Sequence, residues 1–83
     1  MSALKYPLAT EKAMSFIDRH NLITYVVDFR ATKQEIKKEF ESTFNVKVSN
    51  VRTVNMPNNL KKAFIKIAKG YKASDVAAKL KIV

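Results

Sequence analysis

The sequence predicts an α+β domain in which helices pack against a mostly antiparallel sheet of three to four strands, with a βαββ-type core. Three patterns support this prediction. Apolar residues alternate over 22–29 and 61–67, an apolar residue recurs at every fourth position over 36–44, and a short polar turn at 57–59 separates two strand-like segments. The chain has no linker and no low-complexity tract, so we expect one domain over 1–83.

A short helix is predicted over 11–17, because Thr10 can cap it and an acidic residue in its first turn suits the helix dipole. Its inner positions are Ala13, Phe16 and Ile17. A strand is predicted next, over 22–29, since this segment is rich in β-branched and aromatic residues. Its residues on one face are Ile23, Tyr25, Val27 and Phe29.

The second helix has the clearest start signal in the chain. Thr32 and Glu35 are spaced as a capping box, in which each side chain bonds the backbone N–H of the other residue. The apolar stripe that follows consists of Ile36, Phe40 and Phe44. We therefore predict a helix from Lys33 to about Phe44, with this stripe against the sheet.

The last part of the chain predicts a hairpin and a helix. In the strand over 46–56 the apolar parity slips, so a bend is expected near Ser49 and Asn50. Pro57–Asn59 forms the turn, and Gly70 closes the returning strand. A final helix should begin at Ala73 or Ser74, with Val76, Ala77 and Leu80 facing inward.

The returning strand has two chemically different faces. Ala63, Ile65 and Ile67 suit a core, whereas Lys62, Phe64 and Lys66 make a cationic face that contains an aromatic ring. Such a face suits a polyanion that carries stackable bases. The simpler alternative is a half-buried strand whose lysines are solvated and whose Phe64 lies under a loop or helix.

The net charge of +9 is concentrated in the last part of the chain, where seven lysines face one aspartate from residue 61 onward, a balance of +6. Nucleic-acid binding is the favoured interpretation of such a footprint. Binding to an anionic membrane surface is the competing interpretation. It is less favoured because no segment has the roughly 18 apolar residues of a spanning helix, and no membrane insertion is expected.

The sequence offers few residues that could form a catalytic or metal-binding site. The chain has no cysteine, a single histidine (His20) and a single glycine, so neither a metal site nor a glycine-rich phosphate loop is expected, and no cofactor is implied. The first residues contain no apolar run of the signal-peptide kind, so a cytoplasmic location is expected.

An RNA-recognition motif fits the element order only weakly, because its glycine and aromatic signature is missing. Five segments in sequence resemble the family of large-subunit ribosomal protein twenty-three. They are Pro7–Ala13, Ala31–Lys37, Val51–Thr53, Lys61–Ala63 and Asp75–Ala77. Bacterial members carry a long basic loop where this chain has only Pro57–Asn59. The sequence therefore resembles the short archaeal or eukaryotic form, and no role in lining the peptide tunnel is implied.

The resemblance implies a structural, non-enzymatic protein of the large ribosomal subunit. It would bind large-subunit rRNA beside the exit of the peptide tunnel, among neighbouring ribosomal proteins. The implied RNA contacts are Thr10, Lys12, Lys33, Lys37, Arg52, Thr53, Asn55, Lys61 and Lys62. Because duplex RNA is read mainly by its shape, backbone contacts should outnumber contacts to base edges.

The resemblance also implies a docking platform for the signal recognition particle or other exit-site factors. Glu11 and Phe44 match positions in that region, whereas Asn45 stands where many bacterial members have an acidic residue. The residues alone leave alternatives open: Glu11 also suits a plain first-turn charge, and the parity of Phe44 and Tyr25 suits the core. A free regulatory RNA-binding module is the rival to a ribosomal role.

Overall fold

The computed structural model describes residues 3–82 and confirms the predicted α+β class. Its elements, in order, are β1 (Leu4–Pro7), α1 (Glu11–His20), β2 (Leu22–Asp28), α2 (Lys33–Phe44), β3 (Val48–Met56), β4 (Leu60–Ile67) and α3 (Ala73–Lys79). The single domain over 1–83 stays a prediction, and residues 1–2 and 83 lie outside the described part.

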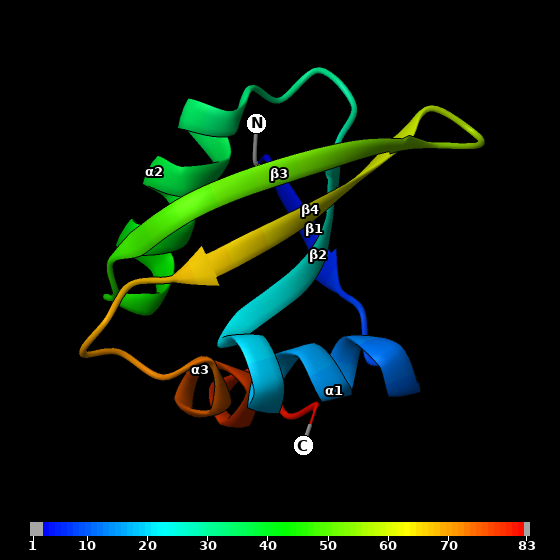
Figure 1. Cartoon of the computed structure of the whole chain (residues 1–83). Coiled ribbons are helices and arrows are strands. Elements are labelled where there is room, and N and C mark those ends of the chain that lie inside the picture. Colours follow the sequence, from blue (N-terminus) through cyan, green and yellow to red (C-terminus); the bar gives the residue numbers. More distant parts are fainter. Residues whose placement is uncertain (1–2, 83) are drawn as a thin grey trace.

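The four described strands form one antiparallel sheet in the order β1-β2-β4-β3 (Figure 1). Since β4 runs opposite to both β2 and β3, these two strands run in the same direction with β4 between them. The connection through α2 is therefore a split β-α-β unit. This arrangement places the lysine-rich strand β4 in the interior of the sheet, flanked on both sides.

Strand β1 is the element that sequence reasoning missed. It is only four residues long and ends at Pro7, yet it pairs with β2 through Leu4, Tyr6 and Pro7. A proline is tolerated there because β1 is an edge strand whose outer side needs no ladder donor. The only local signal was that Leu4 and Tyr6 stand on either side of Lys5, and this pattern is too short to predict a strand.

The predicted bend in the third strand is confirmed. The β3–β4 register shifts between Val48 and Asn50, and the Ser49 hydroxyl donates to the backbone oxygen of Lys66 at 3.3 Å. The predicted turn after β3 is also confirmed, with Asn58 and Asn59 both at positive φ. Asparagine enters this left-handed region more readily than most residues, which allows so short a connection.

Helix α2 begins and ends where the sequence predicts. Both bonds of the capping box are present, from the Thr32 N–H to Glu35 Oε1 at 3.0 Å and from the Glu35 N–H to Thr32 Oγ1 at 3.1 Å. The helix ends at Phe44, and the next residue, Asn45, caps it with a φ of 57° and an N–H that donates to the backbone oxygen of Glu41. Helix α1 is capped by Thr10 as expected, but continues beyond the predicted residue 17 to His20.

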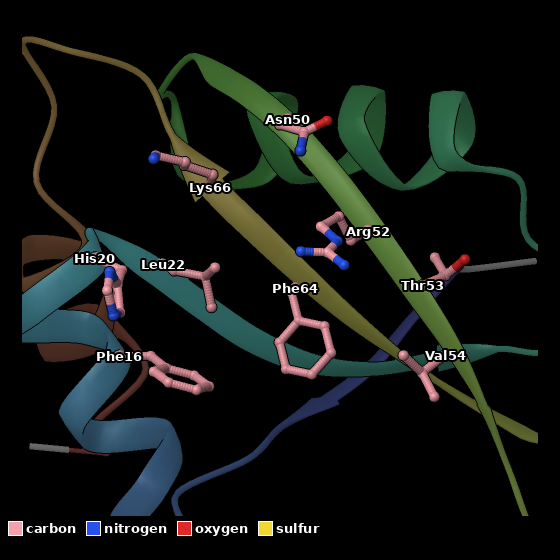
Figure 2. Close-up of a pocket in the computed structure, with 9 residues that line it drawn as sticks. All are labelled: Phe16, His20, Leu22, Asn50, Arg52, Thr53, Val54, Phe64 and Lys66. Carbon is pink, nitrogen blue, oxygen red and sulfur yellow. The ribbon is translucent and has the colours of Figure 1, made fainter.

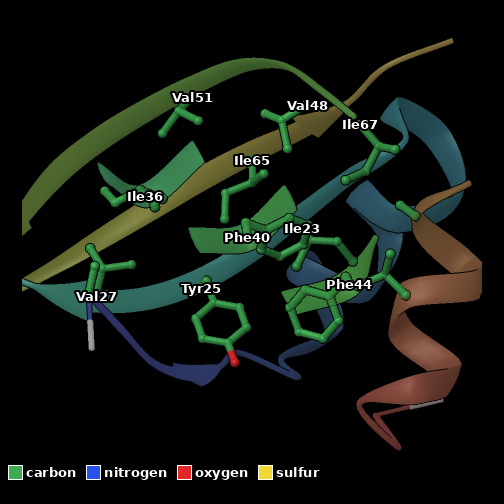
Figure 3. Close-up of a cluster of buried hydrophobic side chains, with 14 of the residues drawn as sticks. Ile23, Tyr25, Val27, Ile36, Phe40, Phe44, Val48, Val51, Ile65 and Ile67 are labelled. Carbon is green, nitrogen blue, oxygen red and sulfur yellow. The ribbon is translucent and has the colours of Figure 1, made fainter. Parts of the chain in front are cut away.

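The core lies between one face of the sheet and helices α2 and α3 (Figure 3). Phe40 is fully buried, and its ring meets that of Tyr25 edge to face at 6.2 Å. Burial raises the pKa of the Tyr25 hydroxyl, and the nearby charge of Glu39 adds to this. The inward residues of α3 are as predicted, with Val76 and Ala77 buried and Leu80 packed at the margin of the core.

One residue that was predicted to lie in a strand is outside it. Phe29 was expected to end the strand over 22–29, on the same face as Ile23, Tyr25 and Val27, but β2 ends at Asp28 and the Phe29 side chain is 47% exposed. A tight turn ends the strand, because Asp28 accepts the N–H of Arg30 on its carboxylate and the N–H of Ala31 on its backbone oxygen. The Phe29 ring instead lies beside the Arg30 guanidinium, whose Cζ is 5.6 Å from the centroid of the ring.

Over residues 3–82 we find no helix that combines the length and the apolar character required to cross a membrane.

Candidate nucleic-acid interface

The face of the sheet that turns away from α2 carries alternate residues of β3 and β4. We call it the open face, and define it by Asn50, Arg52, Val54, Lys62, Phe64 and Lys66. The register sets these side chains in rows across the sheet: Asn50 opposite Lys66, Arg52 opposite Phe64, and Val54 opposite Lys62. Their neighbours in sequence, such as Ala63 and Ile65, are fully buried on the other face. The predicted two-faced character of this strand is therefore confirmed.

Helix α1 covers one margin of the open face. The ring of Phe16, on α1, meets the ring of Phe64, on β4, edge to face at 6.3 Å with an angle of 71° between the ring planes. Both rings are half-buried. The sequence left two interpretations of Phe64 open, a ring available to a nucleic acid and a ring covered by a helix. The structure agrees with each in part, since the ring lies against α1 on one side and borders a hollow on the other.

Two ammonium groups lie close to these rings. Lys62 Nζ is 5.8 Å from the centroid of Phe64, and Lys12 Nζ is 5.9 Å from the centroid of Phe16. These distances fall within the range of a cation–π attraction. The attraction holds both charges next to the aromatic pair while leaving the ammonium hydrogens available to an anion.

Two hollows flank the Phe16–Phe64 pair. The larger, of about 510 Å³, is lined by Phe16, His20, Leu22, Asn50, Arg52, Thr53, Val54, Phe64 and Lys66 (Figure 2). The smaller, of about 180 Å³, is lined by Leu8, Thr10, Lys12, Ala13, Phe16, Thr24, Lys62 and Phe64. None of the described residues that line either hollow is acidic. An aromatic centre with a cationic rim is the arrangement that single-stranded nucleic acids require.

Several carboxylates of the chain make hydrogen bonds that hold the fold together, away from the hollows. On α2, Glu39 accepts the N–H groups of Ala3 and Leu4 at 2.8 and 3.1 Å, and Glu41 accepts the N–H of Val48 at 2.8 Å. These two acids therefore fasten the starts of β1 and β3 to the helix.

Asp28, the last residue of β2, also has a carboxylate that accepts hydrogen bonds within the fold. Hydrogen bonds from the backbone and side chain of Arg30 lower the pKa of the Asp28 carboxyl, and the guanidinium Nε lies 3.4 Å from Asp28 Oδ1. The carboxylate is thus held in a local turn and paired with a cation. The positive potential over the two hollows is left without an acidic neighbour among the residues that line them.

Five of the predicted RNA contacts line the hollows. Arg52 and Thr53 border the larger hollow, while Thr10, Lys12 and Lys62 line the smaller one. Thr10 also caps α1, with its hydroxyl accepting the Ala13 N–H at 3.2 Å. These five come from three separate segments of the chain, and the fold brings them together around the two hollows.

The other four predicted contacts, Lys33, Lys37, Asn55 and Lys61, do not line the hollows. Lys33 and Lys37 are exposed on α2. Asn55 stands opposite Lys61 in the β3–β4 register, so both side chains are on the face of the sheet that α2 covers. An RNA that touched all nine residues would have to wrap around the edge formed by β3.

Lys61 has a structural partner that the sequence did not indicate. Its ammonium donates to the backbone oxygen of Ala31 at 3.0 Å, and the side chain is half-buried. Ala31 immediately precedes the capping box of α2. Lys61 therefore fastens β4 to the start of that helix, in contrast with its neighbour Lys62, which faces the hollows.

The two predicted docking residues differ in their surroundings. Glu11 is exposed in the first turn of α1, where it can meet a partner. Phe44 is only 8% exposed, and its ring packs 4.6 Å from that of Phe40. The helical parity that favoured a core role for Phe44 is confirmed, and this burial leaves little of the ring for a docking factor.

Several residues around the hollows were absent from the predicted contacts: Phe16, His20, Asn50, Phe64 and Lys66. The alternation of β4 pointed to Phe64 and Lys66, but only the β3–β4 register brings Asn50 alongside them. Phe16 and His20 reach the hollow because α1 lies across the margin of the sheet, with their rings 5.7 Å apart. The sequence predicted Phe16 among the inner positions of this helix, but only Ala13 and Ile17 are buried, and the half-buried Phe16 ring lines the hollow.

Comparison with known proteins identifies the family. The family model described as Ribosomal protein L23 matches residues 2–77. The large ribosomal subunit protein uL23 of Trypanosoma brucei brucei is 44% identical over 80 residues, which cover 96% of this chain and 49% of the trypanosome protein. The chain thus spans about half the length of that relative. By its family match over nearly its whole length, and by this identity, the chain belongs to the ribosomal protein L23 family.

Proposed function

We propose that this chain is a structural, non-enzymatic constituent of the large subunit of the cytoplasmic ribosome, where it binds large-subunit rRNA. The family supports the ribosomal assignment, since the relative named above is itself a large ribosomal subunit protein. One structural observation carries the RNA-binding part: Arg52, Lys62 and Lys12 surround an aromatic pair, and no acidic residue lines the same hollows.

Phosphate neutralisation is the main source of affinity in this proposal. Lysine and arginine side chains displace the counterions of the RNA backbone, and threonine hydroxyls can bond phosphate or 2′-hydroxyl groups. Lys33 and Lys37, on the outer surface of α2, would contact a second stretch of RNA or the rim of a larger binding surface. Lys61 contributes mainly through the fold, because its ammonium is already engaged with Ala31.

The proposal places the chain beside the exit of the peptide tunnel, with Glu11 available to exit-site factors such as the signal recognition particle. Glu11 is acidic on a chain of net charge +9 and is exposed in the first turn of α1. A basic factor would be attracted to it, whereas RNA phosphate would be repelled. Phe44 is left out of this docking surface because it is buried.

Sedimentation of a cell lysate tests the ribosomal role. We expect the tagged chain to migrate with large ribosomal subunits at a stoichiometric level, and to be depleted from them when Arg52 and Lys62 are both replaced by alanine. Lys38→Ala, which removes an exposed lysine on the opposite side of the molecule, is the control and should change nothing. A chain found mainly free of ribosomes would instead favour a regulatory RNA-binding module.

A further inference from the structure

The hollows on the open face have a shape and composition that exceed what phosphate binding requires. A site that holds only the RNA backbone needs cations, and these could stand on any exposed surface. Here two half-buried phenyl rings occupy the centre, with Arg52 and Lys66 beside one hollow and Lys12 and Lys62 beside the other. The aromatic centre suits a base that has left its helical stack.

We propose that one unpaired RNA nucleotide docks here, with its base against Phe64 in the larger hollow and an adjoining phosphate between Lys12 and Lys62 at the smaller one. This inference deepens the proposed function and rests on it, because it names the kind of RNA element that the open face recognises. It also assigns base stacking to a particular ring, on a surface where backbone contacts were expected to outnumber contacts to base edges.

The order of residues along β4 supports this placement. Lys62 and Lys66 stand two residues before and two after Phe64, about 13 Å apart along the strand. Both point to the same face as the ring, so their long side chains can reach the phosphates on either side of a base stacked upon it. On the neighbouring strand Arg52 lies directly opposite Phe64, within reach of the base edge or the backbone.

The hydroxyl group of Thr24, at the smaller hollow, also supports this proposal. Thr24 lines that hollow, yet its buried hydroxyl has no hydrogen-bond partner among residues 3–82. A buried hydroxyl without a partner is unfavourable, so a ligand that bonds it would gain affinity. A phosphate or 2′-hydroxyl group entering between Lys12 and Lys62 supplies such a partner.

The first test leaves the protein unchanged. Binding of the full chain to a single-stranded oligoadenylate of about 12 nucleotides is compared with its binding to an abasic ribose-phosphate strand of the same length. Stacking of one base should make the oligoadenylate bind about 5- to 100-fold tighter at equal salt. Equal affinities for the two strands would overturn the inference, while the proposed rRNA binding through phosphates would remain.

The second test uses the absence of tryptophan from the sequence. Phe64→Trp places a single tryptophan at the ring position, and with selective excitation we expect stacking of a base to quench its emission when oligoadenylate is added but not when the abasic strand is added. Phe29→Trp is the control, because the Phe29 ring also lies beside a cation but is exposed outside both hollows. Its emission should not distinguish the two strands. Unchanged emission from Phe64→Trp with both strands would refute the nucleotide site.

A third comparison separates stacking from general RNA affinity. Phe64→Leu should weaken oligoadenylate binding at least about fivefold and leave the affinity for an RNA duplex of equal length within about twofold. Phe29→Leu should alter neither. A thermal unfolding measurement shows whether Phe64→Leu is folded, and if it is not, the tryptophan variant and the abasic strand decide the question. Equal losses for duplex and single strand would contradict the inference.

Discussion

The side-chain oxygen Oδ1 of Asn21 accepts a hydrogen bond from the backbone N–H of Ala73, with 2.6 Å between the two heavy atoms. Ala73 is the first residue of α3, and Asn21 follows the last residue of α1. The amide nitrogen of Asn21 donates to the backbone oxygens of Ile67 and Tyr71, at 3.2 and 3.0 Å. One residue therefore connects the end of α1, the end of β4 and the start of α3.

Asn21 supplies to α3 what a capping residue normally supplies. Lys72 stands at the N-cap position, but its side chain makes no capping hydrogen bond among the described residues. The oxygen of Asn21 satisfies the first free N–H of the helix from a distant part of the chain. Asn21 also has a φ of 52°, which ends α1 in the left-handed conformation that asparagine tolerates.

Replacement of Asn21 by glycine should lower the free energy of unfolding by about 1–3 kcal/mol. Glycine keeps the left-handed backbone but removes the three side-chain hydrogen bonds, and leaves the Ala73 N–H without its partner. Asn21→Ala should cost about 1 kcal/mol more, because it also places a Cβ at positive φ. Urea unfolding of the three proteins measures these differences. A glycine variant as stable as the parent would show that the network contributes nothing.

Replacement of Lys61 should affect the stability of the fold, whereas replacement of Lys62 should affect RNA binding. Lys61→Ala is expected to lower the free energy of unfolding by about 1 kcal/mol, because it removes the bond to the Ala31 oxygen. Lys62→Ala should leave stability nearly unchanged, but reduce the magnitude of the log–log salt slope of RNA binding by roughly 0.7–0.9, the loss of one phosphate contact. Affinities for a large-subunit RNA fragment over a salt series decide this. An unchanged slope for Lys62→Ala would remove it from the interface.

Phe40 and Lys33, both on α2, form a second contrast between core and surface. Phe40→Ala should cost about 3–5 kcal/mol of unfolding free energy, because the ring is fully buried and its loss leaves a cavity in a small core. Lys33→Ala should hardly change thermal unfolding but weaken RNA binding, with Lys38→Ala as the neutral control on the same helix. Were Lys33→Ala to melt the domain as severely as Phe40→Ala, its role would be structural.

The capping box of α2 predicts a particular dependence on acid. Hydrogen bonds from the backbone and then the side chain of Thr32 lower the pKa of the Glu35 carboxyl below its ordinary value of 4.5. A group with a lowered folded pKa stabilises the protein above its unfolded pKa, and this contribution is lost as pH falls through the folded pKa. The stability of the parent should therefore decline below about pH 4.5 through this group.

Glu35→Gln isolates that contribution, since the amide oxygen can still accept the Thr32 N–H but cannot titrate. Urea unfolding from about pH 6 to pH 3 should show the parent more stable than the variant at the upper end, with the difference shrinking towards the lower end. A difference that stays constant over this range would mean that ionisation of Glu35 does not act on stability.

Glu11→Lys tests the docking proposal. The variant should enter large subunits normally, because an exposed acidic residue on a basic chain is expected to point away from RNA. It should bind a basic exit-site factor more weakly through like-charge repulsion. Asp18→Lys makes the same change of charge at an exposed site later in α1 and serves as control. The measurement is factor binding to purified mutant ribosomes at moderate salt.

Two results would speak against the docking role of Glu11. Subunits that lack the mutant protein altogether would assign the residue to assembly. Normal assembly with unaltered binding of every factor tested would leave Glu11 as a first-turn charge that favours the helix dipole.

Local patterns predicted most of the fold because the elements begin and end with strong signals. The capping box at Thr32, the parity slip before Asn50 and the turn at Pro57 each act over a few residues, and all three lie where expected. The exposed place of Phe29 could not be predicted in this way. It depends on a carboxylate that ends β2 one residue earlier than the apolar alternation suggests.

The surface around the hollows was harder to predict than the fold. Phe16 and Phe64 are 48 positions apart in the sequence, and their contact requires both the sheet order and the placement of α1. The family resemblance supplied individual contact positions but not the side of the molecule on which each lies. Lys61 and Lys62 show this most clearly, since adjacent residues of one motif face opposite sides of the sheet.

The central position of β4 has a consequence for the order in which the protein is made. Strands β2 and β3 run in the same direction and are joined only through β4, which lies between them. Neither strand can therefore form its hydrogen bonds with β4 while residues 60–67 are still being synthesised. The sheet must close late, through pairings such as Ile23 with Ile65 that join distant parts of the chain. The strand that completes the ladder also carries Lys62, Phe64 and Lys66. A nascent chain therefore gains its stable sheet and its cationic aromatic surface in the same step, and a partly made chain offers RNA neither.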